Sequence, residues 1–355
     1  MRQIVFYQSG VGAEANFDGD FVPQASVLRE YHFLPASKIR DAYGFIAQNF
    51  HEGDEIFLFG WVNFRCLGAY TARKLAGLID KIGLLETQQL GHFFAIWKDL
   101  VDGKEPTIPP GTRRTNIRCV GVWDTVGAVF NVIDALHIKD TSLSPSIDYA
   151  FHAVSLQENR DRFQPTLWTL PQFGLRNGQV FKEASLNLMT LRLQIWFPGA
   201  HTNVGGSYDR HELSDIALFW MVGEILDASL FNLDADFIAR TKQSGPDAWG
   251  TSQPRNAYNE LTWGSGKLFM KAKTRLATND ITRDITFHHS WANAPDALKD
   301  PYQMITPKIL KETLGAGWMP KYADLNKYER EQKDHWRSGG WQVSITGTLL
   351  KKIKY

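Results

Sequence analysis

The segment EIFLFGWVNFRCLGAYTAR, residues 55–73, decides the fold of this chain. It contains Ile56–Phe59, a short apolar and aromatic run that is typical of a buried strand in a parallel sheet. After a turn, apolar residues recur at the spacing of one helix face, and Gly83 stands where that helix would end. The recurring residues are Ala72, Leu75, Ala76, Ile79 and Ile82. The segment therefore predicts a strand, a sharp turn and a helix in succession.

The turn between this strand and helix resembles a catalytic elbow that has lost its serine. In α/β-hydrolases the elbow has the pattern G-x-S-x-G, because its strained backbone leaves no room for side chains beside the nucleophile. The matching residues here are 64–68, in which only Gly68 is kept and Cys66 stands in the nucleophile position. The amide of Leu67 follows that position, so we expect it to be an oxyanion-hole donor.

Three motifs in the same order give the chain a specific resemblance. They are GAYTARKLAGLI at 68–79, VGVWDTVG at 120–127 and WFPGAHTNVGGSY at 196–208. From about Gln3 to about Val222 the chain resembles a large, mostly uncharacterised α/β-hydrolase-like family of fungi and bacteria that includes phospholipase effectors of type VI secretion. The elbow of that family usually reads GFSRGAYTAR, so the resemblance implies that WVNFRCL replaces FSR between Gly60 and Gly68. It also implies a lipase- or esterase-like ancestral reaction, the hydrolysis of a carboxylic ester of a lipid or another small molecule.

Two residues match the other members of the catalytic triad that the resemblance implies. Asp124 follows the strand expected at 117–123, where a carboxylate is well placed to orient a histidine. His201 follows the strand expected at 191–197 and lies on a glycine-rich loop. An isolated aspartate is often only a cap, and a lone loop histidine is often only a solvated side chain. The motifs favour Asp124 as the acid and His201 as the base, in the chain order of α/β-hydrolases.

Three other positions have alternative interpretations. His152, in the segment YAFHAVSLQENR, is expected to pack or to support the triad from behind. Asn203 replaces the aspartate of the family pattern H-S-D-V-G-G, so it keeps hydrogen-bonding capacity but lacks a charge. A Cys66 thiolate near His201 is chemically able to attack an ester, whereas the alternative is a small buried side chain in a rebuilt loop.

The N-terminal residues 2–8 are predicted to form a strand with no strand before it. Members of the family usually have an earlier strand that ends in a D-G-T-x-N-like loop, and nothing in this chain matches that loop. In α/β-hydrolases a loop after an early strand supplies one oxyanion-hole amide. The resemblance therefore implies a half-missing oxyanion hole and an unpaired strand edge, unless another segment covers that edge.

The alternation of strands and helices predicts an α/β fold with a doubly wound, mostly parallel sheet. Ser37 is expected to cap a helix that runs to about Phe50, and Ser214 is expected to cap a helix that includes Ile225. We expect residues 1–228 to form an α/β-hydrolase-like core, N-terminally truncated relative to the family. Residues 229–355 are expected to form a cap or accessory region that is not independent.

The composition excludes several classes of partner. The 355 residues carry a net charge of +1 and no long basic run, so no nucleic-acid partner is predicted. Neither a signal peptide nor a membrane span is expected, because no apolar run reaches the required ~18 residues. Two cysteines cannot form a disulfide framework, which favours a cytoplasmic location. No cofactor or metal is predicted, because a Gly-rich phosphate loop is missing and His288 and His289 lack ligands at metal spacing.

Three functions are compatible with these observations. The first is an ester hydrolase of the lipase kind, with Cys66, His201 and Asp124 acting through an acyl-enzyme. The second is a catalytically inactive pseudoenzyme that binds a ligand or partner in an aromatic-rich cleft. The third is a truncated or mis-spliced version of an active serine hydrolase, because both departures from the family fall in its most constrained parts.

Overall fold

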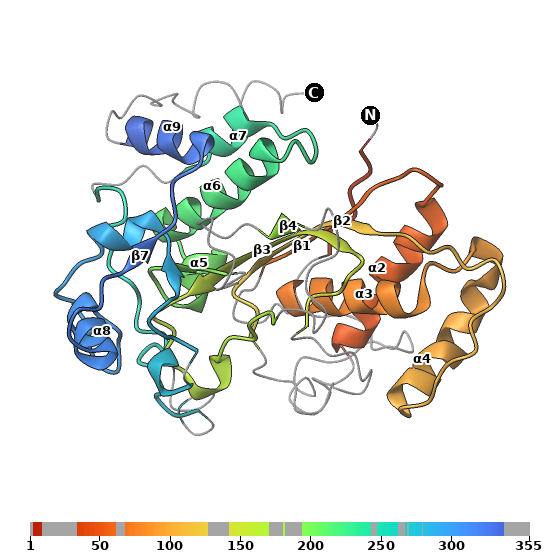
Figure 1. Cartoon of the computed structure of the whole chain (residues 1–355), viewed down its shortest axis with the longest axis horizontal. Coiled ribbons are helices and arrows are strands. Elements are labelled where there is room, and N and C mark those ends of the chain that lie inside the picture. The colour runs from red at the N-terminus through yellow and green to blue at the C-terminus, as the bar shows by residue number, and fades with distance from the viewer. Residues whose placement is uncertain are drawn as a thin grey trace, which may run out of the picture.

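The fold is organised around a sheet that crosses the middle of the molecule (Figure 1). The computed structural model describes residues 3–8, 34–61, 68–126, 142–169, 180–181, 194–242, 247–261, 267, 270–278 and 280–336. The strands lie in the order β1-β2-β3-β5-β6-β7, and β4 pairs with β3 beside β5. Their bounds are β1 (Ile56–Gly60), β2 (Ile117–Trp123), β3 (Ile147–Ser155), β4 (Val180–Phe181), β5 (Ile195–Phe197), β6 (Thr286–Phe287) and β7 (Lys321–Tyr322). All pairings between these strands are parallel, which confirms the predicted sheet type.

Helices cover both faces of this sheet (Figure 1). Helices α2 and α3 lie on one side, and α6, α7 and α9 lie on the other. The helices are α2 (Leu34–Asn49), α3 (Gly68–Ile82), α4 (Phe93–Val101), α5 (His201–Gly205), α6 (Glu212–Asp227), α7 (Ala235–Arg240), α8 (Pro307–Leu314) and α9 (Lys327–Trp336). Short 3-10 turns are η1 (Thr87–His92), η3 (Asp161–Phe163), η4 (Arg275–Thr278) and η5 (His289–Asn293). This two-sided arrangement confirms the predicted doubly wound α/β fold.

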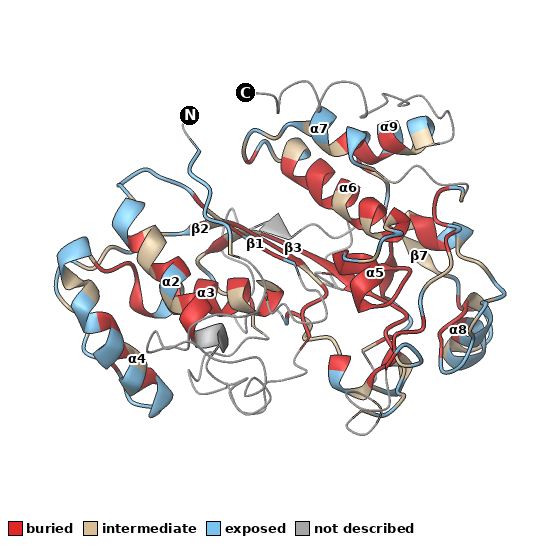
Figure 2. Ribbon diagram, turned by 180° about the vertical axis from the view of Figure 1, so that it is seen from behind, coloured by how far each residue is buried: buried red, intermediate tan, exposed pale blue. Residues whose placement is uncertain are grey.

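Strand β1 shows how the sequence produces the two layers. Side chains alternate between the faces of a strand, so Ile56 and Leu58 pack in the cluster that contains residues of α2 and α3. Phe57 packs on the opposite side, in the cluster that contains α6. Figure 2 shows that buried residues dominate the central strands and α6, as expected when a sheet is covered on both faces.

Several predicted elements have the expected bounds, whereas the predicted serine caps are wrong. The strand at 56–59, the helix that ends before Gly83 and the strand at 117–123 are confirmed by β1, α3 and β2. Helix α2 starts at Leu34, so Ser37 lies inside it. Helix α6 starts at Glu212 after His211, and the Ser214 hydroxyl donates a 2.9 Å hydrogen bond to the His211 carbonyl oxygen instead of capping an N–H.

Residues 3–8 do not form the predicted strand. The Gln3 side chain exchanges hydrogen bonds of 2.9 and 3.2 Å with the backbone of Asn232, and Phe6 stacks on Phe45 of α2 with ring centroids 4.6 Å apart. Ile4, Val5 and Tyr7 remain largely exposed, so little apolar burial is available to hold this segment as a strand. Within the described ranges no strand pairs with the outer edge of β1.

The part of the chain beyond residue 228 extends the same sheet and covers one of its faces. It supplies β6 and β7, and Asn326 donates a 3.1 Å hydrogen bond from Nδ2 to the Trp220 carbonyl oxygen of α6. The Tyr328 hydroxyl of α9 donates to the Ala235 carbonyl oxygen at 2.9 Å. The boundary at residue 228 remains a prediction. None of the helices in the described parts of the chain has the length and apolar character needed to cross a membrane.

Candidate functional site

Asp124 lies at the carboxyl end of β2, where the backbone turns sharply. Its φ is +45°, a conformation that few residues other than glycine adopt and that is often found at functional positions. The Asp124 amide donates a 2.7 Å hydrogen bond to the Ala153 carbonyl oxygen of β3, which holds the turn against the neighbouring strand. As a result, the carboxylate is fully buried at the sheet edge where the predicted site should form.

The Asp124 carboxylate is surrounded by hydrogen-bond donors. Arg275 donates from Nη1 to Oδ1 at 2.6 Å and from Nη2 to Oδ2 at 2.9 Å. Ser155 donates from its amide to Oδ1 at 2.7 Å and from Oγ to Oδ2 at 3.2 Å. Burial alone would raise the pKa of Asp124, but the Arg275 charge and the hydrogen bond from His201 outweigh it and hold this pKa well below its ordinary value. Asp124 is therefore an ionised acceptor.

His201 is the first residue of α5, directly after β5, and it contacts Asp124. Its Nδ1 lies 2.6 Å from Asp124 Oδ2, and both side chains are fully buried. Because the carboxylate is ionised and can only accept, Nδ1 is the donor, and in an unprotonated imidazole the lone pair then lies on Nε2. The Nε2 atom has no hydrogen-bond partner among the residues that the structure describes. The structure thus brings together two predicted residues that are 77 positions apart.

The loop before α5 is shaped by Gly199 and Asn203. Gly199 has a φ of +113°, and its amide donates to Gln157 Oε1 at 2.7 Å. Asn203 Oδ1 accepts hydrogen bonds from the amides of Ala200 at 3.1 Å and Arg255 at 3.0 Å. Asn203 therefore links the loop before α5 to the backbone at Arg255, and a supporting role for it in the site remains a prediction.

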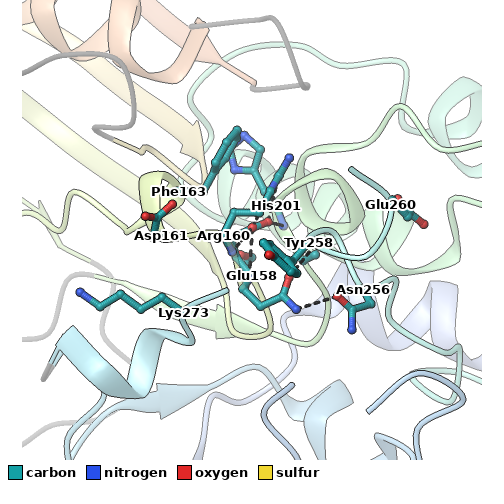
Figure 3. Close-up of polar contacts among 12 residues, drawn as sticks. Glu158, Arg160, Asp161, Phe163, His201, Asn256, Tyr258, Glu260 and Lys273 are labelled. Carbon is teal, nitrogen blue, oxygen red and sulfur yellow. Dashed lines mark hydrogen bonds and ion pairs between the residues drawn. The ribbon is translucent and has the colours of Figure 1, made fainter. Parts of the chain in front are cut away.

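A buried ion pair lies directly beneath His201, as Figure 3 shows. The Glu158 carboxylate accepts from Arg160 Nε at 2.7 Å and Nη2 at 2.9 Å, and from the His201 amide at 3.1 Å. Burial by itself would raise the pKa of Glu158. The nearby positive charges, chiefly that of Arg160, and the hydrogen bonds from Arg160 together outweigh this effect, so the pKa of Glu158 lies below its ordinary value. Glu158 thus fixes the start of α5. The sequence interpretation missed this residue, although two charges directly after an apolar strand were a usable signal.

His152 lies on β3 and supports the turn that carries Asp124. Its Nε2 accepts a 3.1 Å hydrogen bond from the Thr125 amide, which directly follows Asp124. Burial, assisted by the charge of Arg73, lowers the pKa of His152 to about 3. His152 is therefore neutral at physiological pH, and its predicted supporting role remains a prediction.

The elbow keeps the close contact between strand and helix that a nucleophile turn requires. A Cβ atom at Gly60 would overlap the Gly68 carbonyl oxygen, and one at Gly68 would overlap the Trp61 carbonyl oxygen. The Trp61 ring lies 3.3 Å from the position that a Cβ of Gly206 would occupy, so the elbow borders the end of α5. Cys66 and Leu67 lie outside the described residues, and their roles remain predictions.

Arg275 is the contributor to the site that no sequence pattern indicated. It lies 151 positions from Asp124, in a region with no recognisable motif. No group of three or more His, Cys, Asp or Glu residues in the described ranges is arranged to hold a metal ion. The arrangement is a buried carboxylate–imidazole contact in which His201 Nε2 has no hydrogen-bond partner among the described residues.

Comparison with known proteins agrees with the resemblance found in the sequence. The family described as T6SS, phospholipase effector Tle1-like, catalytic domain, matches residues 1–224. An uncharacterised protein of Saccharomyces cerevisiae is 27% identical over 194 residues, which are 47% of this chain and 28% of that protein. A solved structure of the Tle1 effector bound to the VgrG spike of the type 6 secretion system is 18% identical, with a TM-score of 0.28, over 52% of this chain and 33% of that chain. The chain thus spans a third or less of the length of each of these two proteins.

Proposed function

The chain belongs to the family of Tle1-like phospholipase effector catalytic domains, and from this premise we propose that it hydrolyses a carboxylic ester of a lipid. Asp124 and His201 are the acid–base pair, and Cys66 is the nucleophile. The observation that carries this proposal is the 2.6 Å contact between His201 Nδ1 and Asp124 Oδ2, which leaves Nε2 without a partner among the described residues. An imidazole that is oriented by a carboxylate through Nδ1 and has an unpaired Nε2 is what a general base in acyl transfer requires.

In the proposed reaction His201 Nε2 takes the proton of the Cys66 thiol. The thiolate attacks the carbonyl carbon of the ester, and the amide of Leu67 donates to the developing oxyanion. The leaving alcohol receives the proton from His201, which yields a thioester on Cys66. Water, activated by His201, then hydrolyses the thioester, releases the carboxylic acid and restores the thiol.

The second cysteine does not fit the nucleophile role. Cys119 lies on β2 with no exposed surface, and burial raises the pKa of its thiol well above the ordinary value. Its side chain packs in the apolar cluster that includes Ile195 and Met221. The Ser155 hydroxyl also does not fit, because it donates to Asp124. Cys66 is the remaining cysteine in the sequence.

The first test is acylation of Cys66 by a long-chain p-nitrophenyl ester, followed by mass spectrometry and by turnover measurements on phospholipid vesicles. We expect a thioester on Cys66 and a loss of turnover of about 100-fold or more in Cys66→Ala and His201→Ala. His51→Ala is a matched control, because the His51 side chain is exposed and its ion-pair partner is Asp54. An unlabelled Cys66, or turnover that survives in Cys66→Ala, would refute Cys66 as the nucleophile.

A second candidate is a non-catalytic module that binds a lipid or partner. The observation that favours it is the absence of the elbow serine, combined with an Asp124 charge that Arg275 already compensates. This candidate predicts saturable binding to phospholipid vesicles without release of fatty acid, and turnover that depends on His201 would contradict it. Sequencing the transcript through the Gly68 codon separates both candidates from a mis-spliced serine hydrolase. The cytoplasmic location is part of the same proposal, and cell fractionation tests it.

A further inference from the structure

We propose that Arg275 is a positioning residue of this site, which holds the Asp124 carboxylate in the orientation that His201 Nδ1 requires. The inference rests on the proposed role of His201 as the base. It also assigns a contribution to the part of the chain beyond residue 224, where the family match ends. The site is therefore completed by a segment that carries no family motif.

The contacts of Arg275 fix both its own position and that of the carboxylate. The side chain is fully buried at the start of η4. Its Nη1 donates to Asp124 Oδ1 at 2.6 Å and to the Ser155 carbonyl oxygen at 2.5 Å, and its Nη2 donates to Asp124 Oδ2 at 2.9 Å and to the Phe163 carbonyl oxygen at 2.7 Å. Two fixed carbonyls thus set the plane of the guanidinium, and the guanidinium sets the plane of the carboxylate.

This orientation matters because the two carboxylate oxygens have different tasks. Both oxygens accept from Arg275 and from Ser155, but among the described residues Oδ2 alone also faces His201 Nδ1, at 2.6 Å. A carboxylate that rotated about its terminal bond would lose this alignment. A two-pronged donor resists that rotation, whereas a lysine ammonium binds as a point charge and resists it less.

The backbone around Arg275 is paired with the loop that follows β3. Ala272 forms an antiparallel bridge with Arg160, the Lys273 amide donates to the Asn159 carbonyl oxygen at 2.9 Å, and the Asp161 amide donates to the Lys271 carbonyl oxygen at 2.9 Å. Figure 3 places Lys273 and Asp161 at this junction, close to Glu158 and Arg160. The same loop positions the His201 amide through Glu158, so the paired segments set both the acid and the base.

Arg275 is also the cation that compensates the buried Asp124 charge. The other charged or titratable groups that act on Asp124 in the described structure are His201, His152 and Arg160. His152 is neutral because its pKa is lowered to about 3, and Arg160 is paired with Glu158. Removal of Arg275 would leave a buried carboxylate whose remaining donors are Ser155 and His201.

The test uses the full chain with isotope-labelled aspartate and histidine and is read by NMR. In Arg275→Met we expect the Asp124 carboxyl carbon to titrate at a pH raised by about one unit or more, and the downfield proton between His201 Nδ1 and Asp124 to shift or disappear. Arg275→Lys keeps the charge, so it should keep Asp124 ionised but still shift that proton. Ser155→Ala is the control, because it removes a donor to Oδ2 without removing a charge.

Wild-type signals for both groups in a folded Arg275→Met would overturn the proposal. If that variant does not fold, Arg275→Lys decides: an unchanged Nδ1 proton overturns the positioning role, and a shifted proton supports it. These signals need no turnover, so their outcome is separate from that of the Cys66 experiment. Where turnover is measurable, Arg275→Lys should lower kcat by about 10-fold or more with little change in KM, because the orientation matters when charge develops on His201.

Discussion

The segment between β1 and α3 and the contact between Asp124 and His201 differ in how closely they match the motifs that the sequence resembles. No serine stands between Gly60 and Gly68, whereas Asp124 and His201 lie in contact at 2.6 Å. Asp124 is buried and ion-paired with Arg275, so its loss would leave an unpaired charge inside the protein. The contact between Asp124 and His201 is thus tied to the stability of the fold as well as to any chemistry.

The strongest test of this difference is Asp124→Asn. Because Arg275 would be left buried with no carboxylate, we expect the free energy of unfolding to fall by about 3–5 kcal/mol, measured by urea denaturation. The double variant Asp124→Asn/Arg275→Met removes both charges and should recover part of that loss. Strictly additive losses in the double variant would show that the pair does not stabilise the fold as a unit.

At Gly60, where β1 ends, the free energy of unfolding should depend on close backbone packing and not on a charge. Gly60→Ala would force a Cβ into backbone atoms of Gly68 and Ala69, so we expect a loss of about 3 kcal/mol in the free energy of unfolding. Gly44→Ala is the matched control, because it lies in α2 with no atom within 4 Å of the added carbon. The control should be neutral or stabilising by up to about 1 kcal/mol. Equal effects of the two substitutions would mean that the elbow is not tightly packed.

The buried His152 should also make the free energy of unfolding depend on pH. Its folded pKa is about 3 and its ordinary value is 6.5, so between these pH values the unfolded chain binds a proton that the folded chain does not. Stability is therefore lost as the pH falls below about 6.5. The fall in the free energy of unfolding between pH 7 and pH 5 should be about 2 kcal/mol smaller in His152→Asn than in the wild type. The exposed-site variant His51→Asn should retain the wild-type fall, and an unchanged fall in His152→Asn would contradict the buried, neutral state.

The smallest expected effect concerns the family aspartate that this chain replaces. In Asn203→Asp a carboxylate oxygen can accept from the same amides of Ala200 and Arg255, and this gain is offset by burial of the new charge. We expect the free energy of unfolding to change by no more than about 1 kcal/mol in thermal or urea unfolding. A larger loss would show that the loop before α5 depends on the neutral amide.

The secondary structure around the site was predictable because its signals are local. The apolar run at 56–59, the helical spacing that ends at Gly83 and the strand at 117–123 all appear as β1, α3 and β2. The serine caps and the strand at 2–8 were wrong, because short polar side chains and short apolar runs are also compatible with other local structures. Whether such a serine caps a helix, or such a run forms a strand, is decided by the residues that it contacts in the folded protein more than by its own sequence.

By itself the sequence determined the strand, turn and helix at 56–82, the strand at 117–123, the missing serine between Gly60 and Gly68, and the two candidates Asp124 and His201. These features are local in the chain, since each depends on periodicity or on a short motif. Tertiary structure alone decided that Arg275 neutralises Asp124 and that Glu158 holds the His201 amide. The physical reason is that a buried charge must find its partner in space, and here that partner comes from a segment 151 residues away.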